Sequence, residues 1–192
     1  TRHDPFPGAE DGIDIKVTVD VRPDDAMIEV DLTDNPDCFP CGLNLSQACA
    51  ETSALLGIFN AIPEDVPTNQ GSFRRIKLHL RENCVVGIPR HPTSCSVATT
   101  NVADRVGTSV QRGIAELGDG FGMAATGAII PPSIGVISGS SEMTSGPYVN
   151  QIFLGWGGGA ASPTNDAWLS IGHMGNAGLS YQDSIEMDEM RF

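Results

Sequence analysis

The stretch Ile13–Leu32, IDIKVTVDVRPDDAMIEVDL, decides the fold. Apolar and polar residues alternate from Ile13 to Val21, and the alternation resumes from Met27 to Leu32. Alternation with a period of two is typical of a half-buried strand, and the intervening Arg22-Pro23-Asp24-Asp25 has turn chemistry. The stretch therefore predicts a β-hairpin, whose apolar face needs other elements to cover it.

Two later segments predict the helices that provide this cover. Asn44 or Ser46 can cap a helix near residues 45–60, and Thr99, Thr100 or Asn101 can start another near residues 99–117. The apolar face expected for the first helix is Leu45, Cys49, Thr52, Leu56 and Phe59. The face expected for the second is Val102, Val106, Val110, Ile114 and Leu117. The predicted class is α+β, mainly antiparallel sheet with an N-terminal hairpin and these two packed helices.

A glycine-rich turn follows a third apolar run, in the stretch Pro147–Trp168, PYVNQIFLGWGGGAASPTNDAW. The run from Tyr148 to Leu154 predicts a strand, and Gly157, Gly158 and Gly159 allow a tight turn or a close backbone approach. Such a turn either lets two backbones pack or lines a contact with a ligand or subunit. It is not a phosphate loop, because no Gly-Lys-Ser/Thr follows the glycines and no helix pattern begins there.

Composition excludes several functional classes for this 192-residue chain. A formal net charge of −13 repels phosphate backbones and anionic lipid, so nucleic-acid and membrane-surface binding are not expected. No apolar run approaches the roughly 20 residues that span a bilayer. Because the first residues lack an initiator Met and a signal-peptide core, we expect the natural chain to begin elsewhere. We expect a cytoplasmic protein.

The cysteines and histidines form no recognised metal or catalytic motif. Cys38-Phe-Pro-Cys41 lies in a loop context and lacks the second pair that a zinc site would need. We therefore expect five free thiols and assign no metal ligand. The sequence contains no G-x-S-x-G, H-E-x-x-H or Walker motif.

Polar residues gather instead at the ends of the predicted elements. The hairpin ends in four carboxylate or amide side chains, Asp31, Asp34, Asn35 and Asp37, which are either turn formers or functional groups. Arg74, Arg75 and Arg81 make a local basic patch in an acidic chain, either a solvated strand face or a contact for an anion or a subunit.

Several stretches, in this order along the chain, together resemble the hydantoinase B/oxoprolinase family. They are Val30–Asp34 leading to Gly42-Leu43-Asn44, Asn69–Arg74, Asn83–Pro89, Thr99-Thr100-Asn101 with Asp104-Arg105, Gly157–Ala160 with Asn165-Asp166, and Ser184–Glu186 with Glu189. The resemblance covers nearly the whole chain and corresponds to the C-terminal half of a B-type subunit, so residues 1–192 are read as one domain or a fragment. Asp34 and Ser184 depart from the pattern, standing where many members have Gly and Pro.

The resemblance implies part of an ATP-dependent amidohydrolase complex that opens a cyclic amide such as hydantoin, 5-oxoproline or a lactam. The implied partners are an A-type ATP-binding subunit and the N-terminal half of the B-type subunit, which carries His- and Asp-containing metal motifs. The A-type subunit or the N-terminal half would then bind ATP with Mg²⁺ and any divalent metal. This chain would bind no cofactor. We expect the chain to be inactive alone. The alternatives are part of an acetone- or acetophenone-type carboxylase, and a structural or assembly domain of such a complex.

The resemblance and the loop chemistry select one set of candidate site residues. Asp31 and Asp104 are the candidate catalytic carboxylates, able to orient water or a substrate N–H group. The candidates for lining the substrate or an interface are Asn44, Asn69, Arg74, Asn101, Gly157, Gly158 and Gly159. We expect these residues to gather at one face, because unpaired carboxylates and amides are costly to bury.

Overall fold

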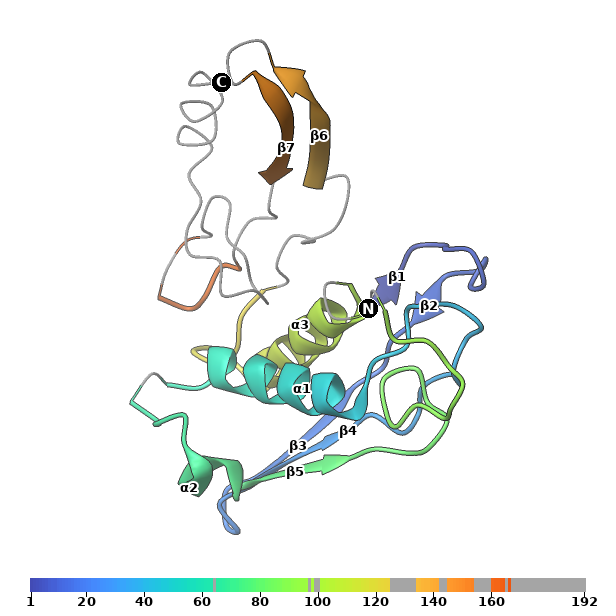
Figure 1. Ribbon diagram of the computed structural model, residues 1–192. Helices are drawn as coiled ribbons and strands as arrows, with labels where there is room; N and C mark the ends of the chain where they lie inside the picture. The colour runs from blue at the N-terminus through green and yellow to red at the C-terminus, as the bar shows by residue number, and fades with distance from the viewer. Residues whose placement is uncertain are drawn as a thin grey trace.

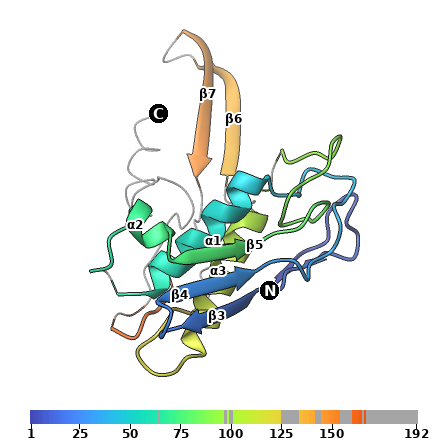
Figure 2. The same cartoon turned by 90° about the horizontal axis from the view of Figure 1, so that it is seen from below.

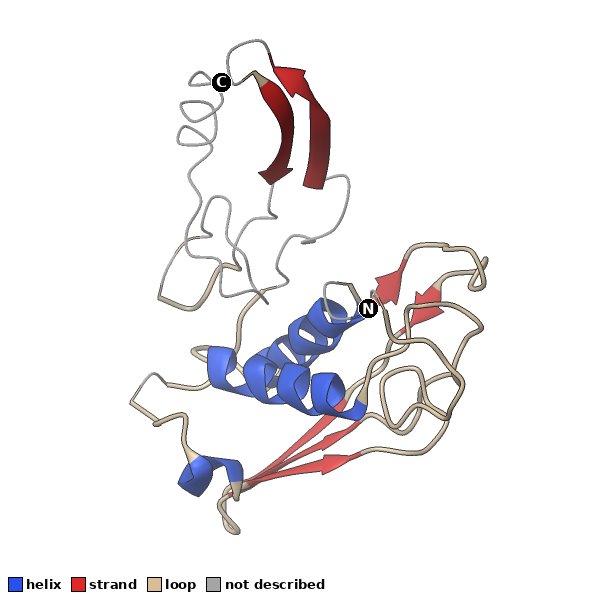
Figure 3. Cartoon of the chain, viewed as in Figure 1, coloured by secondary structure: helices blue, strands red, loops and turns tan. Residues whose placement is uncertain are grey.

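The computed structural model describes residues 1–63, 65–96, 98, 101–124, 134–141, 145–153, 160–164 and 166. Its elements in chain order are β1 (Arg2–His3), β2 (Ile13–Asp14), β3 (Thr18–Arg22), β4 (Met27–Asp31), α1 (Gln47–Ala61), α2 (Gln70–Phe73), β5 (Ile76–His79), α3 (Val102–Ala115), β6 (Ile134–Ser141) and β7 (Gly146–Phe153). The α+β class predicted from the sequence is confirmed (Figure 3).

The predicted hairpin is the centre of the main sheet. Strands β3 and β4 pair antiparallel, with Val19 opposite Val30, and the chain turns at Pro23 to Ala26. The predicted first strand is shorter than the alternation, since Ile13–Asp14 leaves the hairpin and pairs with β1. Strand β5 adds to β4 in parallel, giving the order β3-β4-β5. The described strand pairs are otherwise antiparallel, as the sequence predicted.

Helices α1 and α3 lie side by side on one face of this sheet (Figures 1 and 2). The inward residues of the sheet, among them Val30 and Leu78, pack against them in one core. The outward face carries charged side chains, and Glu29 there is paired with Arg22, Lys77 and His79. The hydrogen bond from His79 at 2.7 Å is the main cause that lowers the pKa of the Glu29 carboxyl.

Helix α1 buries a different face from the one that the sequence predicted. Ser46 caps the helix by accepting a hydrogen bond from the Cys49 amide. The buried residues are Ala50, Ser53, Ala54, Gly57, Ile58 and Ala61, whereas Thr52 is exposed. Small side chains are buried because they let α3 approach closely: a Cβ added at Gly57 would lie 2.5 Å from the Gly107 carbonyl oxygen.

Helix α3 buries the predicted residues Val102, Val106, Val110 and Ile114. Leu117 was also expected on this face, but it lies beyond the end of the helix and is 51% exposed. The strand predicted after Pro147 is confirmed as part of β7, which pairs antiparallel with β6. Figure 1 shows this β6–β7 hairpin standing above the two-layer part of the molecule. Within the described residues, no helix is long and apolar enough to cross a membrane.

Candidate functional site

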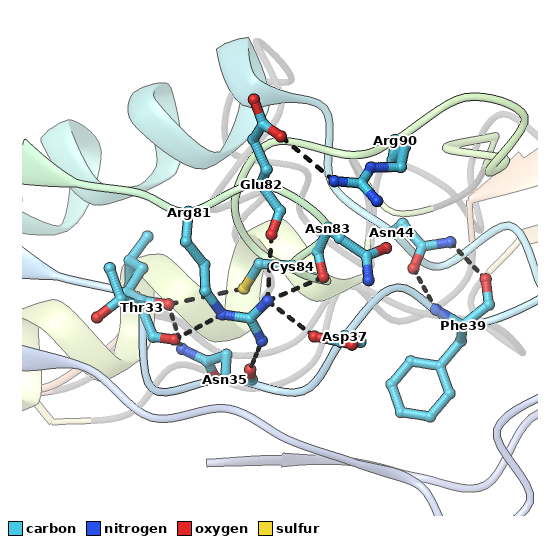
Figure 4. A network of polar contacts seen from close by, with 11 residues as sticks. Thr33, Asn35, Asp37, Phe39, Asn44, Arg81, Glu82, Asn83, Cys84 and Arg90 are labelled. Carbon is cyan, nitrogen blue, oxygen red and sulfur yellow. Dashed lines mark hydrogen bonds and ion pairs between the residues drawn. The ribbon is translucent and has the colours of Figure 1, made fainter.

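The loop after β4 is organised by Arg81, one of the basic patch residues (Figure 4). Its guanidinium donates to the carbonyl oxygens of Thr33, Asn35, Glu82 and Asn83 and pairs with the Asp37 carboxylate at 2.8 Å. Five acceptors around one guanidinium use the planar fork of donors that only arginine provides. Arg81 therefore has a structural role, joining the loop after β4 to the loop after β5.

Asp31 lies at the end of β4, on the outward face of the sheet. It is opposite His79 in β5, and its Oδ1 accepts a hydrogen bond from the Thr33 amide at 2.7 Å. The Thr33 hydroxyl and amide lower the pKa of the Asp31 carboxyl, so this carboxylate is held in its ionised form. The geometry is that of a turn-forming aspartate with one oxygen engaged locally.

Asn44 is fully buried and ties two loops together. Its Oδ1 accepts from the Phe39 amide, and its Nδ2 donates to the carbonyl oxygens of Phe39, Cys41 and Ser94 at 2.8–3.0 Å. These contacts give the side chain a structural role that accounts for its burial.

Asn69 and Arg74 lie at the two ends of α2. The Asn69 Oδ1 caps this short helix by accepting from the amides of Gly71 and Ser72, and both Asn69 and Arg74 are exposed. The cap explains why an asparagine stands there. Gly157, Gly158 and Gly159 lie outside the described residues.

The remaining candidates, Asn101 and Asp104, belong to a buried polar face of α3. They recur with Thr108 and Gln111 at intervals of three and four residues, which places all four on one side of the helix. All four are buried, with at most 8% of each residue exposed. The Gln111 Nε2 donates to the Ala124 carbonyl at 2.8 Å, so the chain after the helix covers this polar face.

Asp104 is the carboxylate of this face. It is completely buried, and among the described residues neither of its side-chain oxygens has a hydrogen-bond partner. The nearest cation is the Arg105 guanidinium, 4.0 Å from Oδ2. Burial raises the pKa of Asp104 to about 6, and Arg105 offsets part of that rise.

Two further side-chain atoms of α3 lack a hydrogen-bond partner within the described part of the chain. The Arg105 Nε and the Gln111 Oε1 are also buried without a hydrogen-bond partner there. Buried polar groups in folded proteins are almost always paired, so these atoms distinguish α3 from the other described helices.

The structure therefore divides the predicted site. Asn101 and Asp104 lie together on α3, while Asp31 lies on the opposite, outward side of the sheet and Asn69 and Arg74 flank α2. Sequence reasoning missed Thr108 and Gln111, because polar residues opposite an apolar helix stripe are ordinarily solvent-exposed. Among the described residues, no group of three or more His, Cys, Asp and Glu side chains is placed to hold a metal ion.

The comparison with protein families agrees with the resemblance in the sequence. The hydantoinase B/oxoprolinase model matches residues 4–192. The chain belongs to the hydantoinase B/oxoprolinase family. No curated protein matched the chain.

A solved structure shares the fold of this hydantoinase B family chain. The ATP-dependent caprolactamase from Pseudomonas jessenii superimposes with a TM-score of 0.69 at 17% sequence identity, over 90% of this chain. The match spans 29% of the caprolactamase chain, so this chain corresponds to less than a third of that structure's length.

Proposed function

We propose that this chain is part of an ATP-dependent amidohydrolase complex that opens a cyclic amide of the hydantoin, 5-oxoproline or lactam type. Family membership over residues 4–192 supports the class, and the fold shared with an ATP-dependent caprolactamase supports the lactam-like substrate. The observation that carries the role of this chain is the buried Asp104 carboxyl on the polar face of α3, whose oxygens accept no hydrogen bond from the described residues.

An amide without ring strain is a poor electrophile, so hydrolysis needs both an activated carbonyl and a group that moves a proton. A carboxyl with a pKa of about 6 changes protonation state near neutral pH, as general acid–base catalysis requires. Asp104 would accept a proton from the attacking water, or donate one to the departing ring nitrogen. Arg105 would face the negative charge that develops on the carbonyl oxygen.

Activation by ATP belongs, in this proposal, to an A-type partner subunit. The sequence of this chain has no phosphate loop. The chain also carries a net charge of −13, which opposes polyphosphate binding. We therefore place nucleotide binding outside this chain.

The proposal is tested in the complete complex with its A-type partner. Ring opening is measured against caprolactam, hydantoin and 5-oxoproline, and carboxylation is measured with acetone and bicarbonate. Asp104→Asn should lower ATP-dependent ring opening by about 100-fold or more. Asp24→Asn, in the exposed hairpin turn, is the matched control and should leave the rate unchanged.

Two results would contradict the proposal at different points. Wild-type turnover by a folded Asp104→Asn complex would remove Asp104 from the reaction and leave the polar face of α3 with a structural role. A wild-type complex that carboxylates acetone and opens none of the cyclic amides would overturn the amidohydrolase assignment. Asp31→Ala, tested in parallel, shows whether the outward carboxylate contributes.

A further inference from the structure

An apolar cavity of about 370 Å³ lies at the end of the molecule where the β3–β4 turn meets α1. Its walls come from that turn, from the last residues of α1 and the loop that follows, and from the segment between α2 and β5. Met27, Phe59 and Val66 contribute apolar surface, and Val66 is 37% exposed. None of its lining residues comes from α3, so it is separate from the polar face that contains Asp104.

Arginines accompany this apolar lining. Arg22 and Arg75 line the cavity, and Arg74 is the neighbour of Arg75 at the end of α2. Arg22 is already paired with Asp20 and Glu29 on the outward face of the sheet. Arg74 and Arg75 are exposed, and no described acidic side chain pairs with either of them.

Most of the described lysines and arginines have a carboxylate partner, whereas Arg74 and Arg75 do not. The sequence contains 24 acidic residues and 11 lysines and arginines, so most basic side chains should find a carboxylate. Two adjacent arginines without such a partner, beside an apolar cavity, offer a bidentate contact for carboxylates together with a pocket for a large side chain. Arginine and buried aromatic side chains are also the residue types that contribute most to the affinity of protein–protein contacts.

We propose that this cavity is a docking site for a polypeptide segment from outside this chain, in which one large apolar side chain is flanked by carboxylates. The apolar side chain would enter the cavity beside Met27, Phe59 and Val66, and the carboxylates would pair with Arg74 and Arg75. Charge complementarity selects this occupant: a basic or purely apolar segment would leave both arginines unpaired. The inference is independent of the proposed activity, because it uses no residue of the α3 polar face.

The test uses the 192-residue chain and a fluorescein-labelled peptide, Glu-Asp-Phe-Leu-Asp-Glu, followed by fluorescence anisotropy. We expect saturable binding that weakens when salt is raised from about 0.1 M to about 1 M, since exposed ion pairs are screened. Arg75→Glu and Val66→Asp should each weaken binding by about tenfold or more. The matched controls are Arg90→Glu and Leu117→Asp, an exposed arginine and an exposed leucine elsewhere, and both should bind as wild type.

Two companion peptides separate the contributions of charge and apolar contact. Lys-Lys-Phe-Leu-Lys-Lys should not bind, and Glu-Asp-Gly-Ser-Asp-Glu should bind at least about tenfold more weakly than the first peptide. The proposal is overturned by absence of saturable binding of the acidic apolar peptide, by equal binding of the glycine-serine peptide, or by equal losses in the control variants. Circular dichroism of each variant confirms that the fold is retained.

Discussion

Replacing Asp104 by asparagine should change how the stability of the chain depends on pH. Burial raises the pKa of this carboxyl from 3.8 to about 6, so the folded chain holds the proton more tightly than the unfolded chain. The stability from this group is therefore fully present below about pH 4 and is lost as pH rises through about 6. The amide side chain of the Asp104→Asn variant does not titrate, so the variant lacks this loss.

The size of the effect follows from the difference between the two pKa values. A separation of about 2 units corresponds to about 3 kcal/mol once the carboxyl is ionised in both states, near pH 8. Roughly half of that cost is already present at pH 5, because the unfolded carboxyl is ionised there while the folded one is protonated. Asp104→Asn should thus gain between about 1 and 2 kcal/mol relative to wild type when pH is raised from about 5 to about 8.

Urea unfolding of wild type and variant at several pH values measures this difference directly. The subtraction removes the titration of the other carboxylates, which is common to both proteins. Asp31→Asn is the matched control, because local hydrogen bonds lower the pKa of Asp31 and its contribution is constant over this pH range. A stability difference between Asp104→Asn and wild type that stays flat from pH 5 to pH 8 would refute the buried-acid interpretation, and with it the acid–base role.

Three further predictions concern packing, the loop network and the thiols. Gly57→Ala should destabilise the fold by about 1–3 kcal/mol in urea unfolding, since its Cβ would meet the Gly107 carbonyl oxygen at 2.5 Å and the Val110 Cβ at 2.7 Å. An effect no larger than that of Gly71→Ala, in exposed α2, would contradict the close contact between the helices. Arg81→Lys should lower the free energy of unfolding by at least about 2 kcal/mol, because lysine cannot reach the five acceptors around the guanidinium. Arg90→Lys should leave it unchanged, and equal effects of the two substitutions would contradict the structural role of Arg81. Thiol titration of the denatured, unreduced chain should find five free cysteines. In the folded chain Cys84 should react slowest, because it is buried and burial raises the pKa of its thiol. Fewer thiols, or rapid reaction of Cys84, would contradict this prediction.

The elements of the fold could be predicted from the sequence wherever one local pattern dominates. The alternation of Ile13–Leu32 predicted the β3–β4 hairpin, and the spacing of Val102, Val106, Val110 and Ile114 predicted the core face of α3. The face of α1 could not be predicted, because hydrophobicity favours its large residues while the contact with α3 selects small ones at Ala54 and Gly57. The parallel addition of β5 to β4 is a long-range pairing that no local pattern encodes.

The candidate site residues also fall into two groups, those with a structural role and those without one. This difference indicates which residue takes part in the reaction. The side chains of Asn44 and Asn69 form hydrogen bonds that explain an asparagine at each position. These bonds hold the neighbouring loops in place and give both residues a structural role. Asp104 has no such explanation: among the described residues neither of its oxygens has a hydrogen-bond partner, and a buried carboxyl in that condition costs stability. Proteins keep a destabilising polar group most readily where function requires it. The sequence alone does not show this loss of stability, because it arises from the packing of α3 in the fold. It is the physical reason to place the reaction on the polar face of α3.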